Sequence, residues 1–198
     1  MAVTYRNRDL DQPLTQDQVK YFANLAAQTP TKQSNRYFDV LAVTNIPLIK
    51  NIFHHTKTPT VSKTKEKLQL CNSQVVAPLL LLYLKVDVKC GDMSKEYEQL
   101  ADWDEVKTDT DQAIGISAGV VSYEANRKGL VTGYCRCYDD GAIKAELSNY
   151  GLDSEEILNI GLLLSIGKPM FDDPRRHQYF DISYEPHHRI DPKIHYIK

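Results

Sequence analysis

Apolar residues recur every three or four positions after Thr15, and this spacing predicts a helix that stops near Pro30. Thr15 can form a capping box with the glutamine three residues later, which favours a helix start at this point. A short apolar run, Phe38–Val43, predicts a strand. Asn45, with a proline two residues on, then opens a second helix.

Two later stretches contain long apolar runs. The run Pro78–Val88 suits a strand that is buried on both faces. The second run, Ser154–Ile166, follows Asp153, which can cap a helix together with Glu156. Because the second half of this run is apolar on all sides, we expect a helix inside the core.

Small residues mark the helix that we predict between Asp109 and Lys128, with Gly129 at its C-terminal cap. Alanine, glycine or serine occupies positions 113, 115, 117, 118 and 119, and each glycine costs about 1 kcal/mol of helix propensity. Such a cost fits a helix against which another backbone or a flat ligand packs closely, and both alternatives stay open. A strand over Leu130–Tyr138 follows the helix.

Buried strands between helices predict an α+β fold, a three-layer α/β/α sandwich. A chain of 198 residues without repeats or a flexible linker predicts a single domain, residues 1–198. From Gln178 the sequence reads as extended. We expect residues 179–198 to form a tail that caps the fold or packs on a partner subunit.

Composition and charge narrow the function classes. Hydrophobic residues make up 42% and charged residues 25% of the chain, as in soluble globular proteins. The net charge of −2 is spread evenly, which disfavours a nucleic-acid partner. The longest apolar stretch, Val75–Val86, is shorter than the roughly twenty residues of a membrane helix, and the N-terminus has no apolar signal region. The four cysteines fit free thiols, so we expect a cytoplasmic protein without a membrane partner.

The usual catalytic motifs are absent from the sequence. It contains no GxGxxG, no P-loop, no HExxH and no GxSxG pattern. Cys135 and Cys137 form a CxC pair, which alone does not make a zinc site, so we expect no metal. If the protein is an enzyme, a cofactor supplies the chemistry and we expect no catalytic side chain.

Four segments resemble, in order, the nitroreductase family of FMN-dependent enzymes. They are the basic stretch Tyr5-Arg6-Asn7-Arg8 before Pro13, the loop Thr29–Phe38, the helix-to-strand stretch Gly115–Thr132, and Ile166–Pro169 followed by Pro174-Arg175-Arg176-His177. The sequence departs from the family pattern where Ser34 stands for an asparagine and Arg36 for a glutamine. It also departs where Cys135, Arg136 and Cys137 replace a glycine-containing segment.

The resemblance implies a cofactor site for FMN. Two basic clusters would hold the phosphate, because the guanidinium fork of arginine matches phosphate oxygens. Their members are Arg6, Arg8, Arg175 and Arg176. Thr31, Lys32 and Ser34 would hydrogen-bond the flavin, and the strand segment Cys135, Arg136 and Cys137 would pass along it.

The resemblance further implies a mixed, mostly antiparallel sheet and a homodimer with FMN at the interface, where chain ends wrap the partner. NADH or NADPH would supply electrons that pass through FMN to a small-molecule acceptor, such as a nitroaromatic or a quinone, in ping-pong order. An alternative, motivated by Ser34, Arg36 and Cys137, is a flavin-binding homodimer without turnover. A third possibility is a flavin-free structural dimer.

Overall fold

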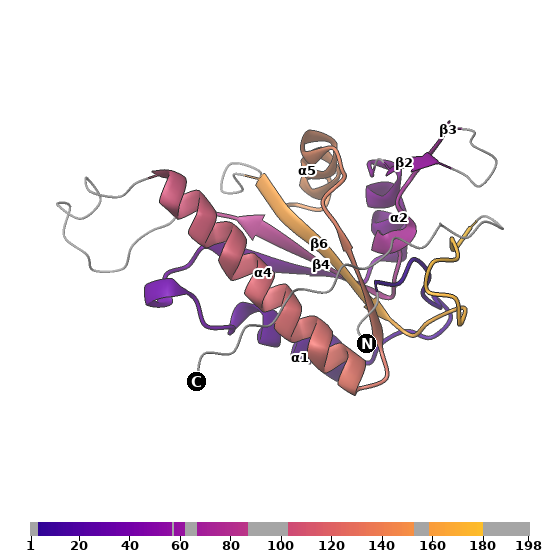
Figure 1. Ribbon diagram of the computed structural model, residues 1–198, viewed down its shortest axis with the longest axis horizontal. Coiled ribbons are helices and arrows are strands. Elements are labelled where there is room, and N and C mark those ends of the chain that lie inside the picture. The colour runs from indigo at the N-terminus through magenta and orange to yellow at the C-terminus, as the bar shows by residue number, and fades with distance from the viewer. Residues whose placement is uncertain (1–3, 57, 62–66, 87–102, 153–158, 180–198) are drawn as a thin grey trace, which may run out of the picture.

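The computed structural model describes residues 4–56, 58–61, 67–86, 103–152 and 159–179 (Figure 1). Helices and strands follow one another as α1 (Gln16–Ala27), η1 (Lys32–Ser34), β1 (Phe38–Val43), α2 (Ile46–His54), β2 (Thr58–Val61), β3 (Lys67–Leu70), η2 (Ser73–Val75), β4 (Leu79–Lys85), α4 (Trp103–Arg127), β5 (Val131–Cys135), α5 (Asp140–Ser148) and β6 (Asn159–Gly167).

A four-stranded sheet with the order β1-β4-β6-β5 forms the centre of the fold. All its pairings among the described residues are antiparallel. Leu82 of β4 lies opposite Leu41 of β1 on one side and Leu163 of β6 on the other, so β4 is an inner strand. The α+β class and the antiparallel character predicted from the sequence are confirmed. Strands β2 and β3 form a separate hairpin that projects from one end of the molecule (Figure 1).

Helices cover both faces of the sheet. Alternate side chains of β4 point to opposite faces, so each face has its own core cluster. Leu79, Leu81 and Tyr83 pack into a core cluster with α1 and α4. Leu80 and Leu82 pack into a second cluster with α2 and α5. Since all five side chains have no exposed surface, the predicted burial of this strand on both faces is confirmed.

The segment predicted as a core helix, Ser154–Ile166, is instead β6 over Asn159–Gly167, where the structure describes it. Its residues from Ile160 onward are buried between β4 and β5. A strand buried on both faces shows no alternation, so its apolar run cannot be distinguished from that of a buried helix. The predicted cap at Asp153 lies outside the described residues.

Helix α4 starts at Trp103, earlier than the predicted Asp109, and ends at Arg127. Gly129 follows with φ +73°, the left-handed conformation expected of a C-terminal glycine cap. Of the small residues, Ala113, Ser117 and Ala118 are buried against α1 and the sheet. This confirms close packing for the face of α4 that is directed at the sheet. Among the described residues, no helix has the length and apolar character needed to cross a membrane.

Candidate anion and cofactor site

Residues 4–9, here called the N-terminal strap, lie against the free edge of β5 and the segment that follows β6. Three backbone N–H groups attach the strap: those of Tyr5, Arg6 and Asp9 donate to the carbonyls of Thr132 (2.9 Å), Pro174 (2.8 Å) and Lys168 (2.9 Å). The strap therefore brings the N-terminal basic residues to the basic segment around Arg175. This is the juxtaposition that the resemblance implied.

Asn7 fixes the strap through both ends of its buried side-chain amide. Its Nδ2 donates to the carbonyls of Asp173 (2.9 Å) and Arg176 (3.0 Å). Its Oδ1 accepts from the backbone N–H groups of Met170 (3.2 Å) and Phe171 (3.0 Å). One side chain thus satisfies four backbone groups and sets the path of the segment that carries Arg175 and Arg176.

The side chain of Arg8 is fully buried, and no described residue offers a hydrogen-bond partner to its Nε, Nη1 or Nη2. Two glycines leave room for it. A Cβ at Gly133 would lie 1.9 Å from Nη2 of Arg8, and a Cβ at Gly167 would lie 3.1 Å from its Cγ. Burial and the positive charge of Arg6 lower the pKa of Arg8 to about 9, which leaves the guanidinium charged at neutral pH. A buried, unpaired cation is a strong candidate for anion binding.

The surroundings of the strap contain one buried thiol and one buried imidazole. Burial raises the pKa of Cys135 to about 11, so this thiol stays protonated and donates to the carbonyl of Cys137. Burial and the charge of Arg6 lower the pKa of His177. Nδ1 of His177 accepts from the Tyr179 backbone N–H, and Nε2 lies 3.4 Å from the Cys71 carbonyl, which assigns the proton of a neutral ring to Nε2.

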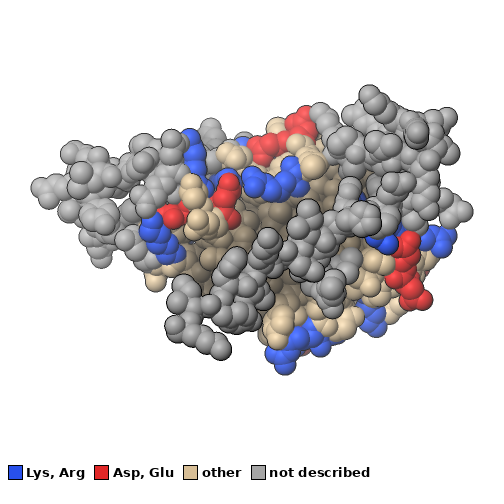
Figure 2. All heavy atoms as spheres, in the orientation of Figure 1, with Lys and Arg blue, Asp and Glu red and all other residues tan. Residues whose placement is uncertain are grey.

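Arg175 and Arg176 follow a turn that begins at Asp173. The carboxylate of Asp173 accepts from the backbone N–H of Arg175 at 2.9 Å. The guanidinium of Arg176 lies 4.2 Å from the ring centre of Phe171, a cation–π contact. On the face that Figure 2 shows, lysines and arginines lie among aspartates and glutamates rather than in one large basic field.

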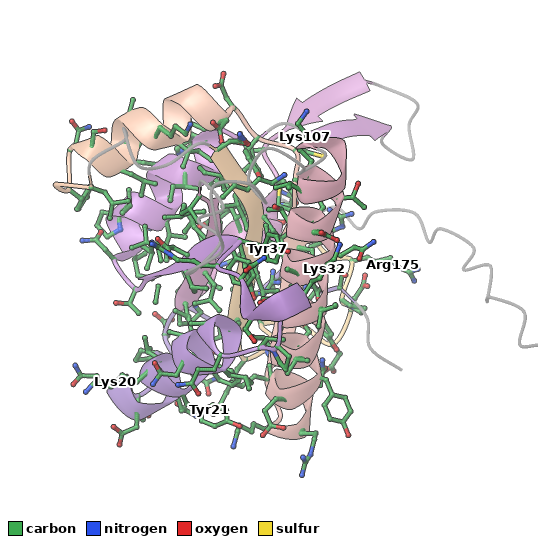
Figure 3. The ribbon with its side chains drawn as sticks, turned by 90° about the vertical axis from the view of Figure 1, so that its left-hand side faces the viewer. Lys20, Tyr21, Lys32, Tyr37, Lys107 and Arg175 are labelled. Atoms are coloured by element: carbon green, nitrogen blue, oxygen red, sulfur yellow. The ribbon has the colours of Figure 1, made fainter. Side chains whose placement is uncertain are left out.

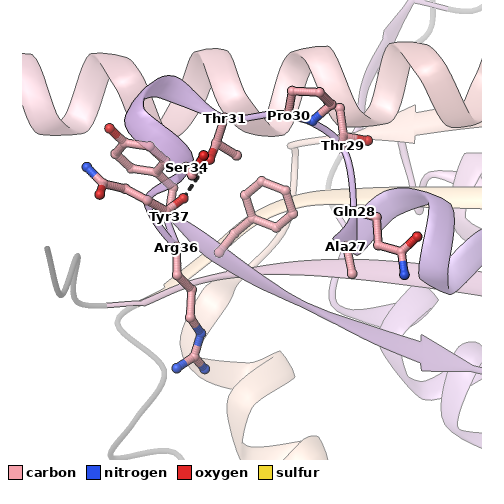
Figure 4. A pocket seen from close by; sticks show the side chains of 10 residues that line it. Ala27, Gln28, Thr29, Pro30, Thr31, Ser34, Arg36 and Tyr37 are labelled. Carbon is pink, nitrogen blue, oxygen red and sulfur yellow. Dashed lines mark hydrogen bonds between the residues drawn. The ribbon is translucent and has the colours of Figure 1, made fainter. Parts of the chain in front are cut away.

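Thr31, Lys32 and Ser34 lie at a different place, beside a cavity of about 320 Å³ lined by residues 27–31 and 34–38 (Figure 4). The hydroxyl of Thr31 donates to the carbonyl of Asn35 at 2.7 Å. Lys32 lies against α4 (Figure 3), where its Nζ pairs with Asp109 at 2.8 Å. Ser34 has φ +58°, which is uncommon for a residue other than glycine and is often found at functional sites.

Arg136 and Cys137 are exposed at the end of β5. The guanidinium of Arg136 lies 3.9 Å from Asp111 of α4, whereas Cys135 is buried on the opposite side beside Asn72. The strand is therefore shorter than the predicted Leu130–Tyr138: it ends at Cys135, and Cys137 is exposed rather than buried beside Cys135.

Within one chain, the structure gathers Arg6, Arg8, Cys135 and the Arg175–Arg176 segment, but it keeps Thr31, Lys32 and Ser34 away from them. Strands β1 and β5 are opposite edges of the sheet, about 14 Å apart across three strand spacings. In Figure 1, η1 lies at the left end of the long axis and residues 168–179 lie at the right end.

Sequence reasoning missed Asn7, Gly133 and Gly167 as parts of this site. A glycine inside a strand signals the close approach of another group, and Gly133 carries that signal. Nothing local in the sequence marks Asn7, because its partners lie more than 160 residues away. Among the described residues, no group of three or more His, Cys, Asp or Glu side chains could hold a metal ion.

Comparison with known proteins gives matches by structure only; no protein-family model and no curated protein matches the sequence. A nitroreductase family protein from Clostridium novyi NT is similar, with a TM-score of 0.62, 14% identity, and 91% of this chain and 89% of that chain covered. The fold is that of the nitroreductases.

Two further solved structures share this nitroreductase fold. An FMN-dependent nitroreductase from Clostridium difficile R20291 has a TM-score of 0.58 and 15% identity, with 91% and 88% of the two chains covered. A BluB-like flavoprotein from Clostridium difficile 630 has a TM-score of 0.61 and 16% identity, with 93% and 91% covered. The structural similarity therefore extends over most of this chain and most of each matched chain.

Proposed function

We propose that the protein is an FMN-dependent oxidoreductase. One observation carries the proposal: the buried Arg8 guanidinium, which has no hydrogen-bond partner among the described residues, belongs to a strap that is bonded to a second basic segment, on a fold that FMN-dependent proteins share. A phosphate dianion is the part of FMN that such a site fits, because it accepts several charge-assisted hydrogen bonds at once.

The residues present fit the phosphate end of FMN. Gly133 and Gly167 leave the slot in which the Arg8 side chain lies, and larger side chains would close it. Arg6, Arg175 and Arg176 complete the set of basic residues on the strap and the segment bound to it. In this proposal they hold the phosphate, and Cys135, Arg136 and Cys137 line the path of the ring system.

Bound FMN supplies the redox chemistry, taking electrons from NADH or NADPH and passing them to a nitroaromatic, a quinone or a similar acceptor in ping-pong order. The chain's own residues bind and orient the cofactor. Cys135 stays a neutral thiol at pH 7 and provides no thiolate nucleophile, in keeping with a site whose chemistry belongs to the cofactor.

The proposed assembly is a homodimer with FMN at the interface. Ile116, Val120 and Tyr123, here called the α4 stripe, are 55%, 40% and 67% exposed and follow helical spacing along one face. Gly115 and Gly119 beside them have open space around them. In this assembly a second copy packed on the stripe brings its Thr31–Ser34 segment to the basic site.

In this proposal residues 1–198 form a single domain, and the tail, residues 179–198, packs on the partner subunit. The proposed location of the protein is the cytoplasm. Residues 180–198 lie outside the described part of the chain. Deleting residues 179–198 should weaken the dimer, and sedimentation velocity would reveal the change. A truncated chain that dimerises as tightly as the full chain would remove the tail from the proposal.

A flavin-binding homodimer without turnover is the second candidate. The favouring observation is that side chains assigned to the flavin ring already have partners: Lys32 pairs with Asp109, and Thr31 donates to Asn35. Arg36, which stands where the family has a glutamine, forms an ion pair with Asp39 instead of pointing into the cavity (Figure 4).

The test is the visible absorption spectrum of the full chain after incubation with FMN and desalting. We expect flavin bands at about one FMN per chain, and then oxidation of NADH or NADPH when an acceptor is added. Retained flavin without oxidation of either nucleotide would favour the second candidate. A colourless protein would contradict both and leave the flavin-free dimer.

A further inference from the structure

The N-terminal strap has a strong set of bonds that hold it in place. Three backbone hydrogen bonds and the four made by Asn7 join it to β5 and to residues 168–176. All of these bonds are made within three residues of Arg8. The strap therefore cannot dock in this position without carrying the Arg8 side chain into the slot.

The Arg8 side chain opposes the same docking. It loses all contact with water, and no described residue pairs with its three nitrogens. The charged group that acts most strongly on it is Arg6, which repels it. Burying an uncompensated charge costs more than a neutral hydrogen bond returns, so the strap of the free chain is under opposing forces.

We propose that the strap is an anion-dependent latch, closed by a phosphate dianion that pairs with Arg8. The anion pairs with the Arg8 charge and removes the cost of burying it. The hydrogen bonds of Asn7 and of the backbone then hold the strap in place. Free inorganic phosphate and the phosphate monoester of a flavin share this chemistry. The inference rests on the proposed function for the natural source of the phosphate, which is then FMN.

The experiment uses the full chain freed of flavin, in buffers of equal ionic strength made with chloride. Inorganic phosphate, FMN and riboflavin are added in separate series. The melting temperature and the hydrogen exchange of the Tyr5, Arg6 and Asp9 amides are measured. At a phosphate concentration one hundred times its dissociation constant, we expect the melting temperature to rise by about 5 to 10 °C. Exchange of the three amides should slow in parallel, and riboflavin should not reproduce the phosphate effect.

Arg8→Met tests the residue, because methionine keeps an unbranched apolar chain and removes the charge. We expect the free variant to melt at a higher temperature than the free wild type, and its response to phosphate to disappear. A purely structural role of Arg8 would give the opposite sign in the free protein. The matched control, Arg127→Met, removes an exposed arginine of α4 and should change neither quantity.

The proposal is overturned if Arg8→Met lowers the melting temperature of the free chain and keeps the full response to phosphate. It is also overturned if phosphate leaves strap exchange unchanged in the wild type. FMN binding with an unchanged response in Arg8→Met would refute the latch and leave the proposed function standing. A phosphate response in a chain that binds no FMN would support the latch and refute the flavin function.

Discussion

Two neighbouring residues of the strap, Asn7 and Arg8, are both buried and polar, but only one of them is satisfied. Asn7 finds a partner for every polar group that it directs at residues 170–176, whereas Arg8 finds none among the described residues. A buried polar side chain whose hydrogen bonds are all made fixes the path of the backbone that it contacts. An unsatisfied cation in the same place points to a ligand.

Asn7→Ala should lower the free energy of unfolding by about 2–4 kcal/mol, because four partly buried backbone groups lose their partner. Urea denaturation followed by circular dichroism measures the loss. Asn24→Ala, at an exposed position of α1, is the control and should stay within about 0.5 kcal/mol of wild type. Equal stability of the two variants would contradict the role given to Asn7.

Arg175→Ala combined with Arg176→Ala should weaken FMN binding by about 1.5–3 kcal/mol for each charge-assisted bond lost, a factor of ten or more in affinity. Flavin fluorescence titration gives the dissociation constant. Riboflavin, which has no phosphate, should bind both proteins alike. The adjacent pair Arg127→Ala and Lys128→Ala, at the exposed end of α4, provides the matched control. An unchanged FMN affinity would remove the C-terminal basic pair from the site.

Among the elements, sequence patterns located α1, α2 and the buried strand β4, and misassigned β6. Helix α1 and its capping box were predicted because Thr15 and Gln18 are three residues apart and bond each other directly. β6 was predicted as a helix because its burial depends on β4 and β5, which no local pattern shows. The same holds for the site: the basic residues stand out in the sequence, but Asn7 and the Gly133 slot depend on contacts across the whole chain.

Ser117→Ala tests how α4 is joined to its neighbours. The Ser117 hydroxyl donates to the Ala26 carbonyl of α1 at 2.8 Å and lies 3.2 Å from the Tyr83 hydroxyl of β4. Its removal leaves both buried groups short of a partner, so unfolding free energy should fall by about 1–3 kcal/mol. Thermal denaturation of this variant and of Ser148→Ala, an exposed serine of α5, makes the comparison. A loss no larger than that of Ser148→Ala would contradict this account.

For the whole molecule, the division of the candidate site between opposite edges of the sheet is the main feature. The basic end lies at the β5 edge, and the Thr31–Ser34 segment precedes β1 at the opposite edge. The α4 stripe offers an apolar surface on which a second copy can pack.

Tyr123→Glu should therefore convert the proposed dimer into a monomer, because it places a charge in the proposed apolar contact. Light scattering after size exclusion gives the molar mass. FMN retention should fall together with the dimer, since in the proposed assembly the second chain completes the site. Tyr150→Glu changes a tyrosine of similar exposure that follows α5 and should leave the mass unchanged. A wild-type chain that is monomeric, or a variant that stays dimeric, would contradict the assembly.

The strap also sets an order of events during synthesis. Asn7 bonds to Asp173, 166 residues further along, so a ribosome moving at about 5–20 residues per second needs roughly ten to thirty seconds to make the intervening chain. The strap therefore closes late in synthesis, although it is made before the elements that it bonds, because β5, β6 and residues 168–176 all lie more than 120 residues further along the chain.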